Sequence, residues 1–580
     1  MTATLPVCYA RHMSVSDREL LHHLSLMPFT DTAELAMVTG EAHVAIHRGL
    51  AGLLADGIVE RVGHGTAHLP TSRRYYLTRR GVGEAAGVLG FDTPSDYVRA
   101  YPVSREWLAL LVRRMDAVAT VYRLAASLSP GTDGRCSQVD FHRRGRFDAV
   151  ITLHDGRSFG VVRQGPALRR RSLHDRLRAI AEYGYRRRPG TVLVLAPSVW
   201  EQRFATRFCE RLNIDDCYVA VESRDSLEDW NSNAWRYASW LFGSLPYSLE
   251  FIRTRGSPNR GPFPEPPERK RASLPDAQRM VQAAPTFGLT SSEKRTLDLI
   301  TDHPMIPREH LERWLGVTKG RVSQMLRNLV RTWGLVEGHG KQGDIRYTLT
   351  EEGIRYVTHR DRAQLPTTRG IWSTELTTDK HGRRRHLGHR IETWARQTRH
   401  ADGVTWFLSE LAAEARATAD SQLTWSVPTA KTDRAFNWGE SAIAPDAVGH
   451  LVADGLHIPF YLEHELRARH PKGVLARLRP YTDYYHSNAP ETDMAPFPVT
   501  LFVVANEEVE ETYARTASRM NLMTLPILVS SADTLTRHGL LERSWRPLWE
   551  SRPRRLALSG LRAYRWDSLR HRMHPVEGET

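Results

Sequence analysis

The sequence predicts an α+β protein of several domains, in which a group of helices with a β-hairpin, followed by an α/β block, occurs twice. Three observations lead to this prediction. The chain has 580 residues, 41% of them hydrophobic, which is enough for about three to five cores of ordinary domain size. Two stretches carry the same motifs in the same order. A proline-rich stretch separates them.

The first shared motif belongs to the helical group and its hairpin. Near the N-terminus, Gly-Ile-Val-Glu at 57–60 precedes Arg-Tyr-Tyr-Leu-Thr at 74–78. In the second copy, Gly-Leu-Val-Glu at 334–337 precedes Arg-Tyr-Thr-Leu-Thr at 346–350. Chance explains any one such match, but a string of matches in the same order indicates an internal repeat.

The second shared motif belongs to the α/β block. Phe-Asp-Ala-Val at 147–150 is matched by Pro-Asp-Ala-Val at 445–448, and each leads through an Asp-Gly turn into an apolar strand. Arg-Leu-Arg then occurs at 176–178 and again at 477–479. We therefore predict a tandem duplication of the whole arrangement.

The repeat and the composition together define five segments. Six prolines lie between Pro258 and Pro275, mixed with Gly, Glu and Arg, a composition that favours extended chain over packed core. We expect each half to fold as its own unit around this linker. The predicted segments are a winged helix-turn-helix at 14–90, an α/β block at 100–245, the linker at 254–284, a second winged helix-turn-helix at 285–360 and a second α/β block at 385–545.

The second copy contains the clearer helix-turn-helix. A predicted helix over 307–315 ends at Gly316, and Thr318 is suited to cap the next helix. Apolar residues recur at helical spacing along this next helix and give it one buried face. Arg, Asn and Gln bond base edges and Lys binds phosphate, so the opposite face is predicted to bind double-stranded DNA. That face carries Lys319, Arg321, Gln324, Asn328 and Arg331.

A predicted hairpin completes the second winged helix. Its strands flank a glycine-rich tip at 338–343, and we expect Lys341 and Arg346 to lie near the DNA backbone. The winged helix fold does not by itself fix function. A winged helix used for protein contacts is therefore an alternative to DNA binding, as is a scaffold that recruits replication or transfer proteins through its α/β blocks.

The first copy has the same outline with a blander recognition helix, predicted over 39–55, which offers His43, His47 and Arg48. Its wing is more basic, so we expect backbone contacts to outweigh base reading there. The basic wing residues are Arg61, His64, Arg73, Arg74, Arg79 and Arg80.

Acidic residues gather in the second α/β block. Strands over 447–452 and 457–465 are predicted to form a hairpin around an Asp-Gly turn. Residues two apart in a strand point to one face, so Glu463 and Glu465 lie together, and the hairpin returns them beside Asp446. We expect the three carboxylates to come close to one another.

This block resembles the PD-(D/E)XK nuclease-like fold, whose motif is an Asp at a hairpin and, on the next strand, an acidic residue, one spacer and Lys. The resemblance implies that Asp446 and Glu463 take the Mg²⁺-binding positions and that Glu465 replaces the lysine. Lys472 on the following helix is the candidate substitute. Without a positioned cation such a site loses most of its electrostatic stabilisation. We expect a degenerate fold without enzymatic activity or cofactor, and a Mg²⁺-dependent nuclease is the alternative.

The first block keeps only part of this pattern. Asp148 is present, and a count of eight residues from each turn glycine places Gln164 at the position of Glu463. Because no carboxylate pair remains, we interpret this block as a packing module or a module that faces nucleic acid.

The order of winged helix, Pro-Asp-Ala, Asp-Gly turn, Leu-Glu-x-Glu and Arg-Leu-Arg resembles the replication-relaxation family. The resemblance covers about 285–545 and, more loosely, about 14–245. It implies a protein of actinobacterial plasmids or integrative elements that acts in replication, transfer or transcriptional control.

Composition supports a polyanionic partner and excludes several other classes. The 80 Lys and Arg against 66 Asp and Glu give a formal net charge of +14. The four cysteines show no zinc-ligand spacing, and the absence of a GxxxxGK[ST] loop argues against NTP-driven unwinding. With no signal peptide and no bilayer-spanning apolar run, we expect a cytoplasmic protein without membrane contact. The sequence does not predict an oligomeric state.

Overall fold

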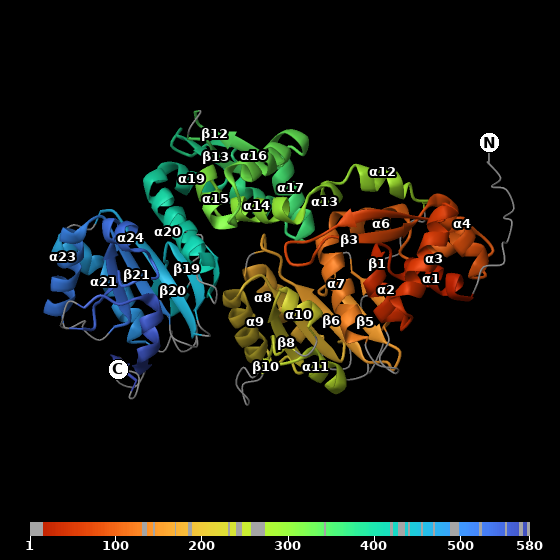
Figure 1. The fold of residues 1–580 in the computed structure, drawn as a ribbon, viewed down its shortest axis with the longest axis horizontal. Coiled ribbons are helices and arrows are strands. Elements are labelled where there is room, and N and C mark those ends of the chain that lie inside the picture. Colours follow the sequence, from red (N-terminus) through yellow and green to blue (C-terminus); the bar gives the residue numbers. More distant parts are fainter. Residues whose placement is uncertain are drawn as a thin grey trace. The chain divides into compact units, whose positions relative to one another are not determined.

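The chain divides into two compact units that each combine helices with a small and a large sheet, a mixed α+β fold (Figure 1). Unit 1 comprises residues up to 295 together with 355–365, and unit 2 comprises 296–354 and the residues from 366 onward. The structure, a computed structural model, describes residues 15–129, 136–142, 145–168, 170–183, 188–229, 232–238, 246–256, 273–341, 344–417, 421–426, 436–438, 441–453, 456–467, 470–487, 498–520, 525–550, 554–567 and 572–576.

Unit 1 begins with three helices and an antiparallel sheet in the order β1-β3-β2. Helix α2 ends at Gly40, whose left-handed backbone (φ 72°) lets its N–H bond the carbonyl of Ala36. The predicted recognition helix over 39–55 is therefore too long, because Thr39 belongs to α2. The elements are α1 (Val15–Leu26), β1 (Thr30–Asp31), α2 (Thr32–Thr39), α3 (His43–Ala55), β2 (Val59–His64), β3 (Ser72–Leu77), α4 (Arg79–Val88) and α5 (Pro94–Ala100).

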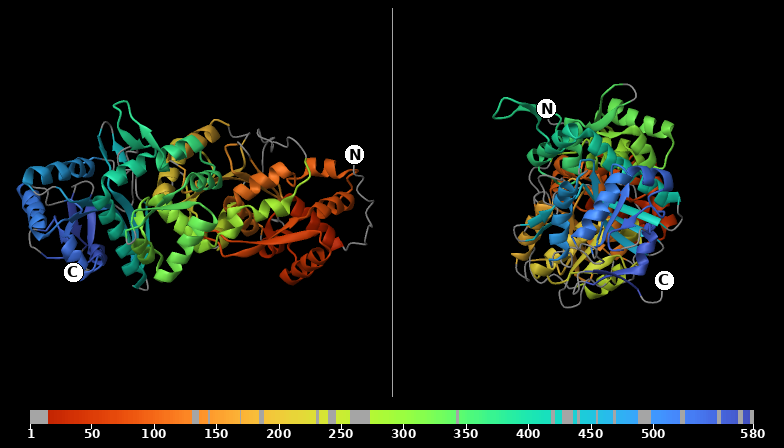
Figure 2. Two further views of the ribbon diagram at one scale, coloured as in Figure 1. Left: turned by 90° about the horizontal axis from the view of Figure 1, so that it is seen from above. Right: turned by 90° about the vertical axis from the view of Figure 1, so that its left-hand side faces the viewer.

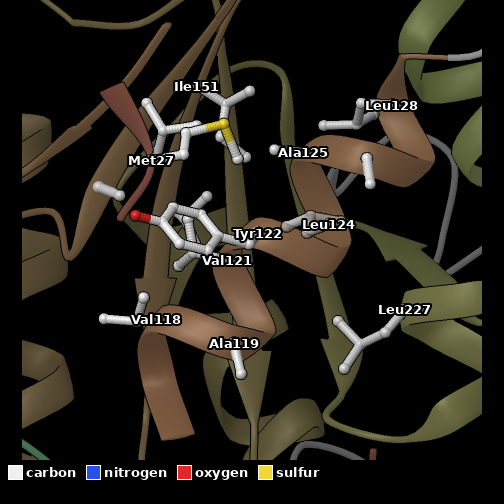
Figure 3. Packing of buried hydrophobic residues seen from close by; sticks show 14 of the residues in the cluster. Met27, Val118, Ala119, Val121, Tyr122, Leu124, Ala125, Leu128, Ile151 and Leu227 are labelled. Carbon is white, nitrogen blue, oxygen red and sulfur yellow. The ribbon is translucent and has the colours of Figure 1, made fainter. Parts of the chain in front are cut away.

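A seven-stranded sheet in the order β10-β9-β8-β7-β6-β5-β4 forms the rest of unit 1. Helix α7 (Met115–Leu128) is the centre of its core, because nearly all of its side chains are buried. Figure 3 shows Tyr122 of α7 near Met27 and Ile151. The other elements are α6 (Arg105–Arg113), β4 (Cys136–Phe141), β5 (Ala149–Leu153), β6 (Ser158–Arg163), α8 (Arg170–Ala181), β7 (Thr191–Ala196), α9 (Val199–Arg211), β8 (Cys217–Val221), α10 (Arg224–Glu228), β9 (Trp235–Tyr237), β10 (Pro246–Tyr247) and α11 (Leu249–Arg255).

The linker predicted over 254–284 lies partly outside the described residues, at 257–272. Its last part is helical rather than extended. Asp276 caps α12 (Ala277–Gln282) by accepting the N–H of Arg279, and Ala277 and Val281 are buried in the core of unit 1. This apolar pair at helical spacing explains why the segment packs. The predicted domain boundaries stay predictions.

Unit 2 begins with the corresponding helices and a sheet in the order β11-β13-β12. A further hairpin, β14–β15, and two helices lead to its large sheet. The elements are α14 (Ser291–Asp302, from residue 296 in this unit), β11 (Ile306–Pro307), α15 (Arg308–Leu315), α16 (Lys319–Arg327), β12 (Val336–His339), β13 (Arg346–Leu349), α18 (Leu365–Trp372), β14 (Leu376–Thr378), β15 (Arg384–His386), α19 (His389–Arg396) and α20 (Thr398–Ala417). Helix α13 (Pro285–Gly288) belongs to unit 1, and α17 (Glu351–Arg360) begins in unit 2 and continues from residue 355 in unit 1.

The large sheet of unit 2 has the order β16-β19-β20-β21-β22-β23. Its elements are β16 (Ser421–Ser426), β19 (Ala447–Ala453), β20 (Leu456–Glu465), α21 (Pro471–Tyr485), β21 (Val499–Val504), α23 (Glu507–Arg519), β22 (Ile527–Ser531), α24 (Ala532–His538) and β23 (Arg546–Pro547). Small pairs β17 (Phe436–Trp438) with β18 (Ser441–Ile443) and β24 (Tyr564–Asp567) with β25 (Arg572–Pro575) lie outside it.

The two large sheets share one connectivity. In unit 1, β4, β5 and β6 are antiparallel neighbours, β6, β7 and β8 run parallel, and β9 returns antiparallel. Unit 2 repeats this pattern: β16, β19 and β20 are antiparallel neighbours, β20, β21 and β22 run parallel, and β23 returns antiparallel. A long helix precedes the first strand and a helix lies in each parallel crossover of both sheets.

Unit 1 encloses charged residues from beyond its own half of the sequence. Lys294 Nζ donates to Asp116 Oδ1 (2.6 Å) and to the carbonyl of Gly65 (2.8 Å). Asp361 accepts from Arg163 (3.2 Å) and from the N–H of Ala167 (3.0 Å). Segments at 291–295 and 355–365 thus complete the interior of unit 1.

No helix among the described residues is long and apolar enough to cross a membrane.

Candidate nucleic-acid interface and carboxylate cluster

Helix α16 is fixed by its caps and by one apolar face. Gly316 ends α15 with a left-handed backbone (φ 66°), and the Thr318 side chain accepts the N–H of Arg321 at the start of α16. After Arg327 the helix widens into a π-helical turn at Asn328–Thr332. The buried side chains of this helix and turn are Val322, Met325, Leu326 and Leu329.

The opposite face of α16 is polar and exposed. Asn328 is only half-buried at the end of the helix, and Arg327 is an exposed cation that the sequence prediction missed. In the described part of the chain, no ion pair engages the cations of this face, so their charge is directed to solvent. The exposed predicted residues are Lys319, Arg321, Gln324 and Arg331.

The hairpin beside α16 carries one of its two predicted cations on the surface. Lys341 is exposed, whereas the adjoining 342–343 lie outside the described residues. Arg346 instead binds the carboxylate of Asp402, with Nη2 to Oδ2 at 3.0 Å, and pairs with Asp344 at 3.1 Å. The hydrogen bond to Asp402 raises the pKa of Arg346 although burial opposes it. The charge of Arg346 is therefore paired within unit 2. The sequence did not predict this pairing.

The first copy presents a smaller polar face. His43, His47 and Arg48 are all exposed on α3, and Arg73 is exposed on β3. No basic side chain follows them on the exposed face of α3 up to its end at Ala55. This helix therefore offers fewer donors than α16.

Arg74 lies inside unit 1 rather than on its surface. It is 1% exposed, and its guanidinium donates to both carboxylate oxygens of Glu34 (3.0 and 3.1 Å) and to the carbonyl of Phe29 (2.9 Å). Burial favours the neutral form, but Glu34 outweighs it and raises the pKa of Arg74. Arg73 and Arg74 alternate across β3, and only Arg73 faces solvent. The predicted phosphate contact by Arg74 is thus replaced by a structural ion pair.

His64 is a second wing residue that the structure buries. Its Nε2 lies 2.9 Å from Asp116 Oδ1 and 3.0 Å from Lys294 Nζ. Burial and the charge of Lys294 lower the pKa of His64 to about 3. The ring is neutral at pH 7 and adds no charge to the wing, in contrast to the basic role predicted for it.

The β19–β20 hairpin brings the predicted carboxylates together. Ala447 pairs with Leu462, so Asp446 lies opposite Glu463, and Glu465 follows on the same face of β20. Asp446 Oδ2 accepts the N–H of His464 at 2.8 Å. Glu463 and Glu465 are 9% and 4% exposed. The predicted proximity of the three residues is therefore present.

Each carboxylate has its own partner. Asp446 Oδ1 bonds His400 Nε2 of α20 at 2.8 Å, and Glu463 accepts from the Tyr481 hydroxyl at 2.5 Å. Glu465 pairs with Arg477 of α21. The sequence reasoning missed His400, Tyr481 and Arg477 as members of this cluster. The spacing of four between Arg477 and Tyr481 on one helix face was the available signal for two of them.

The cluster shifts the protonation of its members. Burial and the neighbouring charge of Asp446 raise the pKa of Glu463 well above its ordinary value, although the Tyr481 hydrogen bond opposes this shift. Burial opposes the charged form of His400, but its hydrogen bond with Asp446 outweighs burial and raises the pKa of His400. The cluster thus shifts the pKa values of Glu463 and His400 in the same direction, upward.

Among the residues that the structure describes, no group of three or more His, Cys, Asp or Glu is arranged to hold a metal ion. Lys472, the candidate substitute for the missing lysine, is exposed on α21 beside Arg479 and Asp483. The guanidinium of Arg477 lies next to the carboxylates and is paired with Glu465.

In the matching hairpin of unit 1, arginines contact the aspartate that corresponds to Asp446. Asp148 accepts the N–H of Arg163 (2.6 Å), as Asp446 accepts that of His464, and it pairs with Arg176 (2.7 Å) and Arg362 (2.9 Å). Burial alone would raise the pKa of Asp148, but these arginines hold it well below its ordinary value.

The strand register corrects the count made from the turn glycines. Asp148 donates its N–H to Val161 as Asp446 does to Leu462, so Val162 matches Glu463 and Gln164 matches Glu465. The count failed because the β19–β20 ladder continues to Ala453 and Leu456, whereas the β5–β6 ladder ends at Thr152 and Ser158.

Comparison with known proteins gives one family match. Residues 297–500 match the family model described as Replication-relaxation. The matched segment contains α16, its hairpin and the β19–β20 carboxylate cluster, and it suggests a role associated with plasmid replication. Searches of curated proteins and of solved structures returned no match.

Proposed function

We propose that the protein binds double-stranded DNA through α16 and the β12–β13 hairpin, which act as the recognition helix and wing of a winged helix-turn-helix. The single observation that carries this proposal is the exposed face of α16, where Lys319, Arg321 and Gln324 point away from the buried apolar face. A helix with one buried face and unpaired Arg, Lys and Gln on the other fits the major groove.

The process served is the replication of a plasmid or integrative element. Support comes from the family match over 297–500, which includes the whole of this interface. The net charge of +14 favours association with DNA in general. Transfer and transcriptional control of the same element are the other processes that binding at a specific site would serve.

We also propose that the two halves arose by tandem duplication and that the large sheets have a degenerate PD-(D/E)XK-like fold without enzymatic activity. The shared strand connectivity supports the duplication. The ion pair of Glu465 with Arg477, at the place where a nuclease would position a lysine, supports the loss of catalysis. In unit 1 the positions that correspond to Glu463 and Glu465 are taken by Val162 at the end of β6 and by Gln164 just after it.

Footprinting on plasmid DNA tests the DNA-binding proposal. Wild-type protein is expected to protect a discrete site with or without Mg²⁺. Arg321→Ala should weaken specific binding by about 1–3 kcal/mol, because it removes a contact to a base edge. Lys341→Ala should instead lower affinity for all sequences and reduce the salt slope by about 1.

The matched control is Arg313→Ala on the neighbouring α15, which is exposed and pairs with Glu410 at 2.7 Å. It removes the same charge from a helix that the proposal does not place in the groove, and it should leave specific binding unchanged. Equal binding by wild type, Arg321→Ala and Arg313→Ala across a salt titration would refute the assigned interface.

A further inference from the structure

We propose that the β14–β15 hairpin of unit 2 binds the phosphate backbone of duplex DNA beside the segment contacted by α16. This inference rests on the DNA-binding function proposed above and extends its contact surface. The two strands pair antiparallel from Leu376 with His386 to Thr378 with Arg384. In Figure 2 a hairpin in the blue-green of this part of the chain stands out from the helices next to it.

The hairpin concentrates positive charge that is not neutralised. Its four cations are all exposed, and no ion pair engages them within the described residues: Lys380, Arg383, Arg384 and Arg385. The one acidic residue, Asp379, uses its carboxylate to accept the N–H groups of His381 (2.8 Å) and Arg383 (2.9 Å) and so shapes the turn. Protein surfaces ordinarily intersperse both signs of charge, so this segment is suited to a polyanion.

The base of the hairpin is held firmly. His386 donates its N–H to Glu392 (2.7 Å), and its ring Nδ1 lies 2.9 Å from the carbonyl of Thr374. Leu387 donates its N–H to the carbonyl of Glu375 (2.8 Å). A cationic segment on a fixed base loses less conformational entropy on binding than a flexible tail does.

The hairpin starts next to the proposed wing. Thr374, two residues before the start of β14, donates its hydroxyl to Glu337 on β12 at 2.7 Å. Since a strand rises about 3.3 Å per residue, the turn lies roughly 20 Å from that anchor, the length of about six base pairs. A duplex held by α16 and β12–β13 would continue alongside this hairpin, and this continuity favours DNA over an acidic protein as its partner.

The test compares duplex lengths and salt dependence in the full chain. The hairpin variant carries Lys380→Ala, Arg383→Ala, Arg384→Ala and Arg385→Ala together. The matched control removes four exposed arginines on or after α23 and α24: Arg515→Ala, Arg519→Ala, Arg537→Ala and Arg543→Ala. Both variants should unfold at the wild-type temperature, because every replaced side chain is exposed. Binding is measured by fluorescence anisotropy on a duplex of roughly one helical turn and on one of roughly two turns.

On the longer duplex we expect the hairpin variant to bind about 10- to 100-fold more weakly than wild type near 0.15 M salt, with a salt slope lower by about 2–4. The control should lose much less, and on the short duplex the hairpin variant should approach wild type. A hairpin variant that behaves like the control on both duplexes overturns the inference and leaves the α16 interface standing. Wild type that binds neither duplex overturns both proposals.

Discussion

Burial divides the basic side chains into those that remain exposed and those that the fold pairs with carboxylates in its interior. Arg73 and Arg74 are neighbours in sequence with opposite environments, one exposed and one paired with Glu34 in the interior. The same distinction applies to Lys341, which is exposed, and Arg346, which pairs with Asp402. A count of basic residues overstates the interface, because paired cations contribute structure rather than recognition.

This contrast predicts a difference in stability between adjacent substitutions. Arg74→Ala leaves the carboxylate of Glu34 buried without its bidentate partner, and such a loss costs about 3–5 kcal/mol. Arg73→Ala removes an exposed side chain and should change stability by no more than about 0.5 kcal/mol. Urea denaturation of both variants measures the difference, and equal midpoints would contradict the placement of Arg74.

The raised pKa of Glu463 predicts how stability depends on pH. A carboxyl group with a raised folded-state pKa binds its proton more tightly in the folded protein, so stability falls as pH rises from the unfolded pKa through the folded one. Glu463→Gln removes this titration. The variant should melt at a higher temperature than wild type at pH 8, and the difference should shrink towards pH 4. A difference that grows on acidification would contradict this assignment.

At the level of elements, the same helix and hairpin arrangement is used with different chemistry in the two units. Arg176 of α8 and Arg477 of α21 both approach the hairpin of their sheet. In unit 1 the arginine binds Asp148 directly, whereas in unit 2 it binds Glu465 and leaves Asp446 to His400. In both units an arginine of the helix after the hairpin thus pairs with a carboxylate of that hairpin.

The β19–β20 hairpin is accordingly expected to be catalytically silent. Wild type should leave supercoiled plasmid intact with Mg²⁺ or Mn²⁺, because the carboxylates are engaged by Tyr481, Arg477 and His400 and no lysine is positioned beside them. A plasmid-nicking assay with wild type, Asp446→Ala and Glu463→Ala measures this. Cleavage by wild type that both substitutions abolish would establish the nuclease function instead.

For the whole molecule, the division into units does not follow the repeat in the sequence. In unit 1, Lys294 forms an ion pair with Asp116. Asp361 pairs with Arg163, and Arg362 pairs with Asp148. Lys294, Asp361 and Arg362 lie beyond the proline-rich stretch. Several buried charges of the first half of the sequence therefore take one of their partners from beyond this stretch.

A fragment of residues 1–256 should consequently be much less stable than one of residues 1–365. In the shorter fragment, Asp116, Asp148 and Arg163 each lose one charged partner but keep another partner. Removing one partner of a buried ion pair costs up to about 3–5 kcal/mol. Thermal unfolding followed by circular dichroism compares the two. If the shorter fragment unfolds cooperatively at the same temperature as the longer one, residues 291–295 and 355–365 are dispensable for unit 1.

The sequence by itself determined the local elements and their order, because caps, glycine turns and apolar spacing are short-range signals. It located α16 to within a residue of its start and identified the polar face from Lys319 to Gln324. It also paired Asp446 with Glu463, since hairpin geometry depends on neighbouring residues.

Only the tertiary structure decided which charges remain free. Arg74, His64 and Arg346 find partners far away in the chain, and His400 and Arg477 reach the carboxylates from other elements. Long-range packing sets these pairings, and the sequence around each residue does not show which partner its side chain reaches.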